Sequence, residues 1–231
     1  MRTLFILSTL LATCLAKVIP EPVVAASSGY AYAVDLDRAV SPSAFTCMKR
    51  SGYSTVFTRA YDPAGSGRFD VNAVNNIRNA NKVRTVWLQV TSPVNWGANN
   101  QANIYFLNDI ISAAKSVGVT IGFYTNIYDW QQITKGAWVE GAMLWYWNVN
   151  GGGPQGETPA NFNDFRPFGR FTKPTVKQFG QVENVCGVTV NRDVYTVNRS
   201  TSFLAASSQK DGEFVVGNFG GEPLTDLLKI E

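Results

Sequence analysis

Carboxylates are the side chains best placed for acid–base chemistry in this sequence, because it contains no histidine. The lack of histidine excludes Ser-His-Asp and Cys-His nucleophiles and histidine-ligated metal sites, and we expect neither a metal nor another cofactor. Asp35 and Asp37 are two residues apart at the end of an expected strand, a spacing that points both side chains to one face. We expect Asp37 to lie just past the strand and to cap the turn before Ser41. The alternative that the spacing allows is a carboxylate pair with Asp35.

Segments typical of strands and helices alternate along the chain, which predicts a mainly parallel α/β sheet or barrel. We expect helices from Ser41-Pro42, from Asp70, over 101–116 and, more briefly, after Tyr128. The glycine run 151–153 begins a loop to about Pro174, of the kind that shapes a cleft at the carboxyl ends of strands. The expected strands are short and rich in β-branched and aromatic residues: 30–36, 55–61, 85–90, 119–125, 143–147, 176–179 and 188–195.

Both ends of the chain carry signals that bound the folded domain. Arg2 and the apolar run after it predict a signal peptide over residues 1–16, with a cut as late as residue 26 as the alternative. We expect one domain over 29–200 and a C-terminal tail over 201–231, with an N-glycosylation sequon at Asn198. No later apolar stretch reaches membrane length, and the scattered charges form no basic patch, so neither a membrane span nor nucleic-acid binding is expected.

The cysteines support export. Cys14 leaves with the predicted signal peptide, so Cys47 and Cys186 remain. An even pair in a secreted protein predicts one disulfide, and two free thiols are the alternative.

An ordered series of motifs runs along the chain: Ala33-Val34-Asp35-Leu36-Asp37, Phe45-Thr46-Cys47, Arg59-Ala60-Tyr61, Trp87-Leu88, Gly122-Phe123-Tyr124-Thr125, Leu144-Trp145-Tyr146, Lys177-Gln178-Phe179 and Val185-Cys186-Gly187. Together these motifs resemble the lysozymes of glycoside hydrolase family 25, especially their nematode and amoeba-like branch, over about residues 30–195. The resemblance implies an irregular β/α (TIM-like) barrel that cleaves bacterial peptidoglycan by acid catalysis. It also implies release into the gut lumen or a lysosome-like compartment, for defence against bacteria or their digestion. We expect a monomer.

The catalytic residues that the resemblance implies are mostly replaced. Asp35 matches the aspartate that ends the family's first strand. Gln89 and Thr91 stand where the family has an aspartate and the glutamate that donates the proton, and Asn191 stands where it has a late aspartate. Of four implied carboxylates, we therefore expect only Asp35, with Asp37 as the substitute acid. The chain also lacks one βα unit of the family between residues 80 and 85, so the barrel must close differently, stay open or fill the gap from elsewhere.

Aromatic residues at expected strand ends predict a sugar-binding surface, because flat rings stack on sugar faces. The candidates for substrate binding are Tyr124, Tyr146, Trp147 and Tyr195, whereas the large rings Trp87 and Trp145 are expected in the core. Arg59 is a further candidate: it meets a substrate carboxylate, pairs with Asp35, or makes a structural ion pair.

Three interpretations of function follow. The first is a secreted lysozyme-like protein that acts on or binds peptidoglycan with impaired hydrolysis, since an amide and a hydroxyl do not donate the proton that glycoside cleavage needs. The second is an active muramidase that uses Asp35 and a relocated acid such as Asp37. The third is a catalytically inactive sugar-binding or structural domain.

Overall fold

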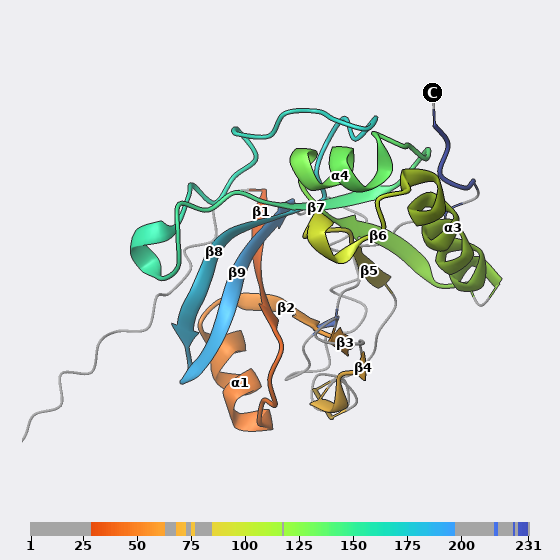
Figure 1. Cartoon of the computed structure of the whole chain (residues 1–231). Helices are drawn as coiled ribbons and strands as arrows, with labels where there is room; N and C mark the ends of the chain where they lie inside the picture. The colour runs from red at the N-terminus through yellow and green to blue at the C-terminus, as the bar shows by residue number, and fades with distance from the viewer. Residues whose placement is uncertain are drawn as a thin grey trace, which may run out of the picture.

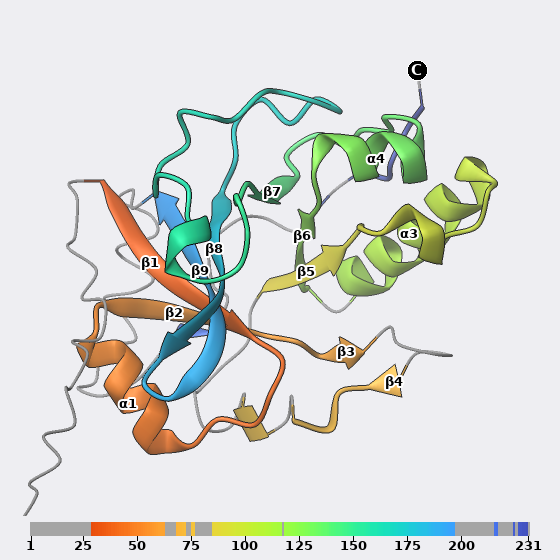
Figure 2. The same cartoon turned by 60° about the vertical axis from the view of Figure 1, so that its left-hand side comes forward.

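The computed structural model describes residues 29–62, 68–72, 75–76, 85–116, 118–196, 215–216, 224 and 226–230. Most of these residues surround one curled sheet of eight strands in the order β10-β2-β1-β9-β8-β7-β6-β5 (Figures 1 and 2). A small two-stranded ribbon, β3 (Tyr61–Asp62) and β4 (Arg68–Phe69), forms a separate sheet. The strands of the main sheet are β1 (Tyr30–Leu36), β2 (Tyr53–Thr58), β5 (Thr85–Gln89), β6 (Thr120–Tyr124), β7 (Met143–Trp147), β8 (Val176–Val185), β9 (Val188–Thr196) and β10 (Val215–Val216).

The sheet is mixed and is not seen to close. Strands β5 to β8 are parallel neighbours, β1 is parallel to β2, and β9 is antiparallel to both β1 and β8. Within the described residues, the order of pairing ends at β5 on one side and β10 on the other. The α/β class expected from the sequence is therefore confirmed, whereas a closed TIM-like barrel is not.

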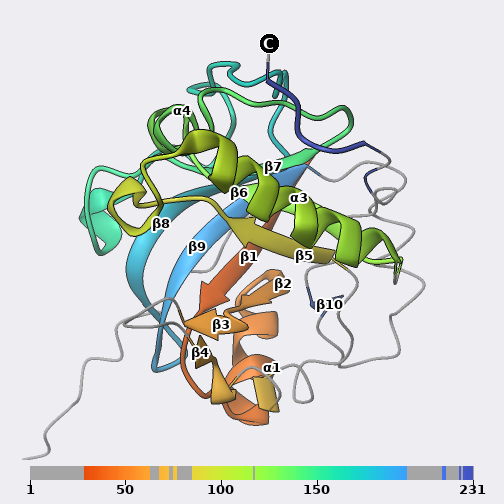
Figure 3. The same cartoon turned by 45° about the vertical axis from the view of Figure 1, so that its right-hand side comes forward.

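Strand β10 comes from the segment expected to be a tail. Val215 and Val216 pair in parallel with Thr55 and Val56 of β2, so a distant part of the chain lies beside β2 (Figure 3). Leu224 and Leu228 from the same segment are buried in the core under α3 (Asn100–Ser116). Part of the expected tail thus belongs to the folded unit.

The helices begin where their capping residues predict. The Ser41 side chain accepts a hydrogen bond from the backbone of Ala44 at 3.2 Å, and α1 runs over Pro42–Arg50. Helix α4 (Ile127–Thr134) begins slightly earlier than expected, because Asn126 caps it by accepting from the Asp129 backbone at 2.8 Å. Residues 71–72 and 75–76 are helical after Asp70, as expected. The structure also has two short 3₁₀ turns, η1 (Pro93–Asn95) and η2 (Pro154–Gly156).

The hydrophobic core divides by sheet face. Helices α3 and α4 cover the outer face of β5 to β7, where Ile104, Leu107 and Ile111 bury the stripe that the sequence predicts. Helix α1 covers the outer face around β1, β2 and β9. The concave inner face carries a third, aromatic cluster that contains Phe57 and Trp145. Because helices cover the outer face, side chains of the inner face form the concave surface of the curled sheet.

A disulfide ties the first helix to the last hairpin. Cys47 of α1 and Cys186, in the turn between β8 and β9, are bonded across 139 residues with their Cα atoms 5.9 Å apart. The pairing predicted from the sequence is confirmed. The predicted signal peptide 1–16 and the Asn198 sequon lie outside the described residues. No helix in the described part of the chain is long and apolar enough to cross a membrane.

Candidate active site

Strand register brings four polar residues together on the inner face of β1, β9 and β8. Asp35 of β1 lies opposite Asn191 of β9, and Asp193 of β9 lies opposite Gln178 of β8. Because side chains alternate along a strand, residues 191 and 193 share one face, which is also the face of Asp35. The site thus depends on three neighbouring strands that come from opposite ends of the sequence (Figure 2).

Two amide groups hold the Asp35 carboxylate. Gln178 Nε2 donates to Asp35 Oδ2 at 2.6 Å, and Asn191 Nδ2 donates to Asp35 Oδ1 at 2.9 Å. The Asp35 side chain is only partly buried, whereas Gln178 is buried. The two amides therefore fix the orientation of a carboxylate that is only partly accessible to solvent.

A second carboxyl group, Asp193, lies beside Asp35. Asp193 is 0% exposed, and its Oδ1 accepts a hydrogen bond from Trp145 Nε1 at 2.9 Å. Its Oδ2 is buried without a hydrogen-bond partner among the described residues, and the Asp35 carboxyl is the neighbouring acid that acts on its pKa. Two carboxyl groups in contact cannot both be ionised without strong repulsion, so the pair must share a proton.

Burial sets where that proton resides. Burial raises the pKa of Asp35 to about 6, while the hydrogen bonds from Gln178, Asn191 and Asp193 oppose this rise. Burial raises the pKa of Asp193 well above its ordinary value, and the nearby charge of Asp35 raises it further. Their mutual hydrogen bond lowers the pKa of Asp35 and raises that of Asp193, so a proton shared by the pair resides preferentially on Asp193.

The residues that replace the expected acids hold one another. Gln89 Nε2 donates to Thr91 Oγ1 at 3.0 Å at the end of β5. Gln89 is exposed and lies two residues after Trp87, which belongs to the inner-face cluster. This edge of the inner face therefore offers an amide and a hydroxyl, and neither group can act as a general acid.

Of the four predicted sugar-binding aromatics, two lie close to Asp35. The rings of Tyr124 and Trp147 have centroids 5.0 Å apart, and both side chains are only partly buried. Tyr124 also donates from its hydroxyl to Gln178 Oε1 at 3.2 Å, which connects the ring to the carboxylate site. Trp145 stacks on Phe57 at 4.3 Å and is buried, as expected for a core residue.

The other predicted site residues lie elsewhere. Tyr195 is buried opposite Ala31, at the far end of β1 from Asp35, and its hydroxyl is hydrogen-bonded to Ser54 and Thr55. Arg59 makes ion pairs with Asp70 at 2.9 Å and with Asp37 at 3.5 Å rather than with Asp35.

Asp37 and Tyr146 are also held by partners outside the site. Asp37 is exposed just beyond β1 and pairs with Arg38 and Arg59. Tyr146 packs in the outer-face core, and its hydroxyl donates to Asp164 Oδ1 at 2.7 Å. The structure thus brings together Asp35, Asn191, Tyr124 and Trp147, but not Asp37, Arg59, Tyr146 or Tyr195.

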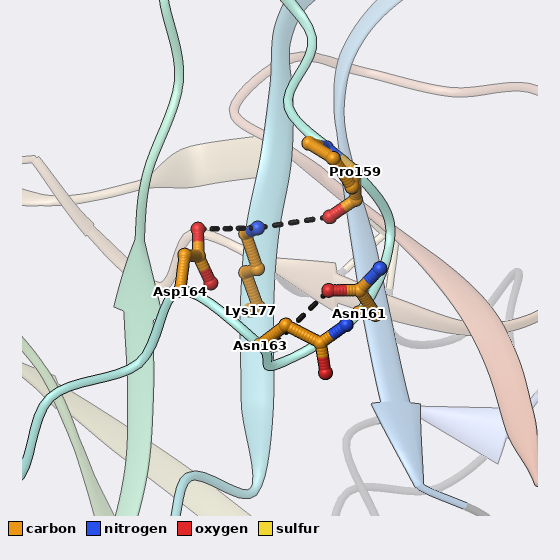
Figure 4. A pocket seen from close by; sticks show the side chains of 5 residues that line it. All are labelled: Pro159, Asn161, Asn163, Asp164 and Lys177. Atoms are coloured by element: carbon orange, nitrogen blue, oxygen red, sulfur yellow. Dashed lines mark hydrogen bonds and ion pairs between the residues drawn. The ribbon is translucent and has the colours of Figure 1, made fainter.

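The loop after β7 is fastened to the outer face of β8 by a buried ion pair. Lys177 is 0% exposed, and its Nζ donates to Asp164 Oδ2 at 2.7 Å and to the Pro159 carbonyl at 2.9 Å (Figure 4). Asn161 and Asn163 complete the wall of a cavity of about 260 Å³ there. Because Lys177 and Gln178 are consecutive in β8, the strand fastens this loop on one face and holds Asp35 on the other.

Sequence reasoning missed Asp193 and Gln178. The signal for Asp193 was present, because strand alternation from the singled-out Asn191 places residue 193 on the same face. Gln178 had no such signal, because its role depends on β8 and β9 pairing in a register that contains irregularities. Among the described residues, no group of three or more acidic or cysteine side chains is placed to hold a metal ion.

The fold and the site are those of an α/β protein that holds a partly buried carboxylate and aromatic rings on the concave face of a curled sheet. Comparison with known proteins gives the family. The family profile described as "Lysozyme-like protein 1" matches residues 26–84 and 80–179. The chain therefore belongs to the lysozyme-like proteins, a family that is similar to the lysozymes of glycoside hydrolase family 25.

Individual relatives agree with this assignment. The chain is 42% identical to Lysozyme-like protein 7 of Caenorhabditis elegans over 245 residues, covering 88% of this chain and 85% of the relative. It is 44% identical to Lysozyme-like protein 1 of that organism, covering 86% and 78%. It is 27% identical to "Probable GH family 25 lysozyme 5" of Dictyostelium discoideum, covering 70% and 89%.

A solved structure shares the fold. The muramidase from Trichobolus zukalii superposes with a TM-score of 0.50 at 13% identity, covering 76% of this chain and 97% of that one. At this identity the likeness concerns the fold alone.

The comparisons also bear on the missing βα unit. The match to Lysozyme-like protein 7 runs over 245 residues but covers 88% of a 231-residue chain, which is about 203, so about 42 aligned positions have no residue here. The family profile matches in two parts that meet at residues 80–84. That junction is where the sequence predicts the missing unit.

Proposed function

We propose that this lysozyme-like protein binds the glycan of bacterial peptidoglycan and hydrolyses it poorly or not at all. The observation that carries the proposal is the contrast between the centre of the inner face, at β1, and its edge, at β5. On β1, Asp35 is held by two amides and lies near the open rings of Tyr124 and Trp147. On β5, Gln89 and Thr91 are hydrogen-bonded to each other and hold no acidic proton. The site can accept hydrogen bonds from sugar hydroxyls but lacks a proton donor at that edge.

An active muramidase that uses a relocated acid is the second candidate, and Asp193 is the observation that favours it. Its pKa is raised well above the ordinary value by burial and by the charge of Asp35, which favours a proton beside Asp35. However, glycosidases place their two carboxyl groups about 5–9.5 Å apart, on either side of the scissile bond. Asp193 instead lies on the same side as Asp35 and is 0% exposed, so it does not reach a glycosidic oxygen. Asp37, the acid expected from the sequence, is engaged by Arg59 and Arg38.

The cellular setting is part of the same proposal. We propose export under the predicted signal peptide and a role in defence against bacteria or in their digestion, with peptidoglycan as the partner of a monomer. The disulfide supports export, because such bonds persist in oxidising compartments. The curled sheet is, on this view, a shortened form of the family's TIM-like barrel.

The test measures binding and hydrolysis separately on the same protein. Binding is followed by co-sedimentation with insoluble peptidoglycan, and hydrolysis by loss of turbidity of a cell-wall suspension. We expect the parent protein to sediment with peptidoglycan without clearing it, and Asp35→Asn to reduce the bound fraction. Asp226→Asn is the matched control, because it removes a charge that pairs with Lys229 on the surface.

Each alternative has its own signature. Clearing by the parent protein that Asp35→Asn abolishes would establish the muramidase, and loss of clearing in Asp37→Asn would identify Asp37 as the relocated acid. If the parent protein neither sediments with peptidoglycan nor clears the suspension, the structural-domain interpretation is supported. Because general acid catalysis contributes about 10²–10⁴-fold, we expect the double variant Gln89→Asp/Thr91→Glu to raise any residual clearing by a measurable factor.

A further inference from the structure

Strand β8 contains a bulge directly beside the Asp35 site. Gly180 pairs with Arg192 and Glu183 pairs with Val190, so three steps along β8 oppose two steps along β9. The extra residue is accommodated at Gln181 and Val182, opposite Asn191. Bulges bend a strand and re-aim its groups, and they occur next to functional sites.

The bulge has an unfavourable backbone conformation. Val182 has a φ of +57°, in the left-handed region, and its side chain is 65% exposed. A β-branched residue there is an outlier that persists only when surrounding contacts impose it. An exposed valine gains little from packing, so the contacts that impose this conformation must be made by the backbone.

The bulge residues donate hydrogen bonds to both of the amide side chains that hold Asp35. The Val182 backbone N–H donates to Asn191 Oδ1 at 3.1 Å, and Gln181 Nε2 donates to Gln178 Oε1 at 2.7 Å. Each amide therefore has its oxygen occupied by a donor from the bulge. The opposite end of each amide, its NH₂ group, is then directed at Asp35.

The loop after β7 is hydrogen-bonded to the bulge. The Gly153 backbone N–H donates to the Gln181 carbonyl at 2.6 Å, and Gly152 forms a bridge with Gln181. A Cβ atom on Gly152 would make an ordinary van der Waals contact of 3.4 Å with the Val182 side chain, so the two residues lie side by side. This contact gives residues 151–153 a structural role that the sequence alone did not reveal.

We propose that the bulge at Gln181–Val182 is a positioning device for the candidate site: it fixes the orientation of Gln178 and Asn191 so that Asp35 accepts a hydrogen bond on each oxygen. An inverted amide would place an oxygen against the carboxylate, and the bulge donors prevent this inversion. Asp35 is thereby presented as an acceptor for ligand hydroxyl or amide N–H groups. The identity of the ligand rests on the proposed glycan-binding function. The orientation of the Gln178 and Asn191 amides does not, since it is a property of the free protein.

The test is the titration of Asp35, because a merely structural bulge would not change it. The ionisable groups that surround Asp35 are Asp193 on β9, Tyr124 on β6 and Asp37 after β1. The titration is recorded by carboxyl ¹³C NMR of the full chain, and the Asp35 signal is assigned by its loss in Asp35→Asn. The parent midpoint is expected near a pKa of about 6.

The decisive variants remove donors to the Gln178 oxygen. Gln181→Leu leaves only the Tyr124 hydroxyl on Gln178 Oε1, and Gln181→Leu/Tyr124→Phe leaves neither bulge nor ring donor. As Gln178 becomes free to invert, we expect the Asp35 midpoint to rise in two steps, by about one pH unit in total. Gln101→Leu is the matched control, because Gln101 is exposed on α3, which covers the outer face of the sheet, and should leave the midpoint of the inner-face Asp35 unchanged.

The outcomes separate this proposal from the proposed function. Folded variants, judged by near-UV circular dichroism and the intact disulfide, whose Asp35 midpoint equals that of the parent would overturn the positioning role. A shifted midpoint in variants of a parent that does not sediment with peptidoglycan would keep the positioning role and refute glycan binding. A variant that unfolds is replaced by Gln181→Met, which also lacks the amide donor and for which the same rise is expected.

Discussion

At the scale of single residues, the site is a carboxyl pair of Asp35 with Asp193, whereas the sequence offers only Asp37 as a second acid. The expectation compared fixed motif positions, and Asn191 occupies the position where the late carboxylate was sought. Asp193 supplies a carboxyl group two residues later on the same face of the strand. Burial and the interaction with Asp35 raise the pKa of Asp193, so that it binds the proton that the two carboxyl groups share. This role depends on tertiary packing and cannot be predicted from a sequence motif.

The shared proton predicts an effect of pH on stability. A carboxyl group whose pKa is raised on folding holds a proton that the unfolded chain releases, so folding stability falls as pH rises from the ordinary value toward the folded one. For Asp35 this window lies between pH about 4 and about 6, and Asp193 extends the fall to higher pH. We therefore expect the free energy of unfolding, measured by urea denaturation, to be lower at pH 8 than at pH 5.

Asp193→Asn tests the cause of that dependence. An asparagine oxygen still accepts from Trp145 Nε1, and its NH₂ group donates to Asp35 as the protonated acid does. The variant should be as stable as the parent near pH 5 and more stable by about 1–3 kcal/mol at pH 8, because no buried acid needs to hold a proton. An equal loss of stability at both pH values would contradict the proton-sharing pair.

At the scale of elements, the sequence correctly predicts the features that depend on residues close together in the chain, such as the starts of helices. The capping Ser41 and the apolar stripe with Ile104, Leu107 and Ile111 correctly place α1 and α3, because caps and helical periodicity are local properties. Strand β8 is longer than expected and continues through its bulge to Val185, because pairing with β9 stabilises it. The two-residue β10 has no sequence signal, since it exists only through its contact with β2.

The ion pair that fastens the β7–β8 loop predicts a strong stability effect. Asp164→Asn would leave the fully buried Lys177 ammonium without its carboxylate. Breaking a buried pair by removing one partner costs about 3–5 kcal/mol, and the partial exposure of Asp164 places the expected loss near the lower end of that range. Urea denaturation measures it.

A double variant supplies the control for this ion pair. Lys177→Met/Asp164→Asn removes the uncompensated charge and should recover at least half of the loss, because a methionine of similar length suits the buried position. If the single and double variants were equally unstable, the loss would come from the hydrogen bonds that Tyr146 and Asn148 donate to Asp164, not from the ammonium.

At the scale of the whole molecule, the shortened chain still forms a site because its key strands lie away from the shortening. The junction at residues 80–84 precedes β5, whereas Asp35, Asp193 and Gln178 come from β1, β9 and β8 at the centre of the sheet. At one edge of the sheet, β10 lies beside β2. The sequence predicts the shortening but not this strand, because pairing between distant segments depends on the folded structure.

The disulfide is the covalent link across this central region, since it joins α1, which follows β1, to the β8–β9 turn. Closing a loop of 139 residues restricts the unfolded chain, and the chain-entropy relation gives about 4–5 kcal/mol of stabilisation. We expect Cys47→Ala/Cys186→Ala to lose a comparable free energy of unfolding in guanidinium, and the parent to lose it when a reductant is added. The reductant should not change the double variant. If the reduced parent kept its full stability, the link would be redundant with the pairing of β1 and β9, and the central strands would hold the site by hydrogen bonds alone.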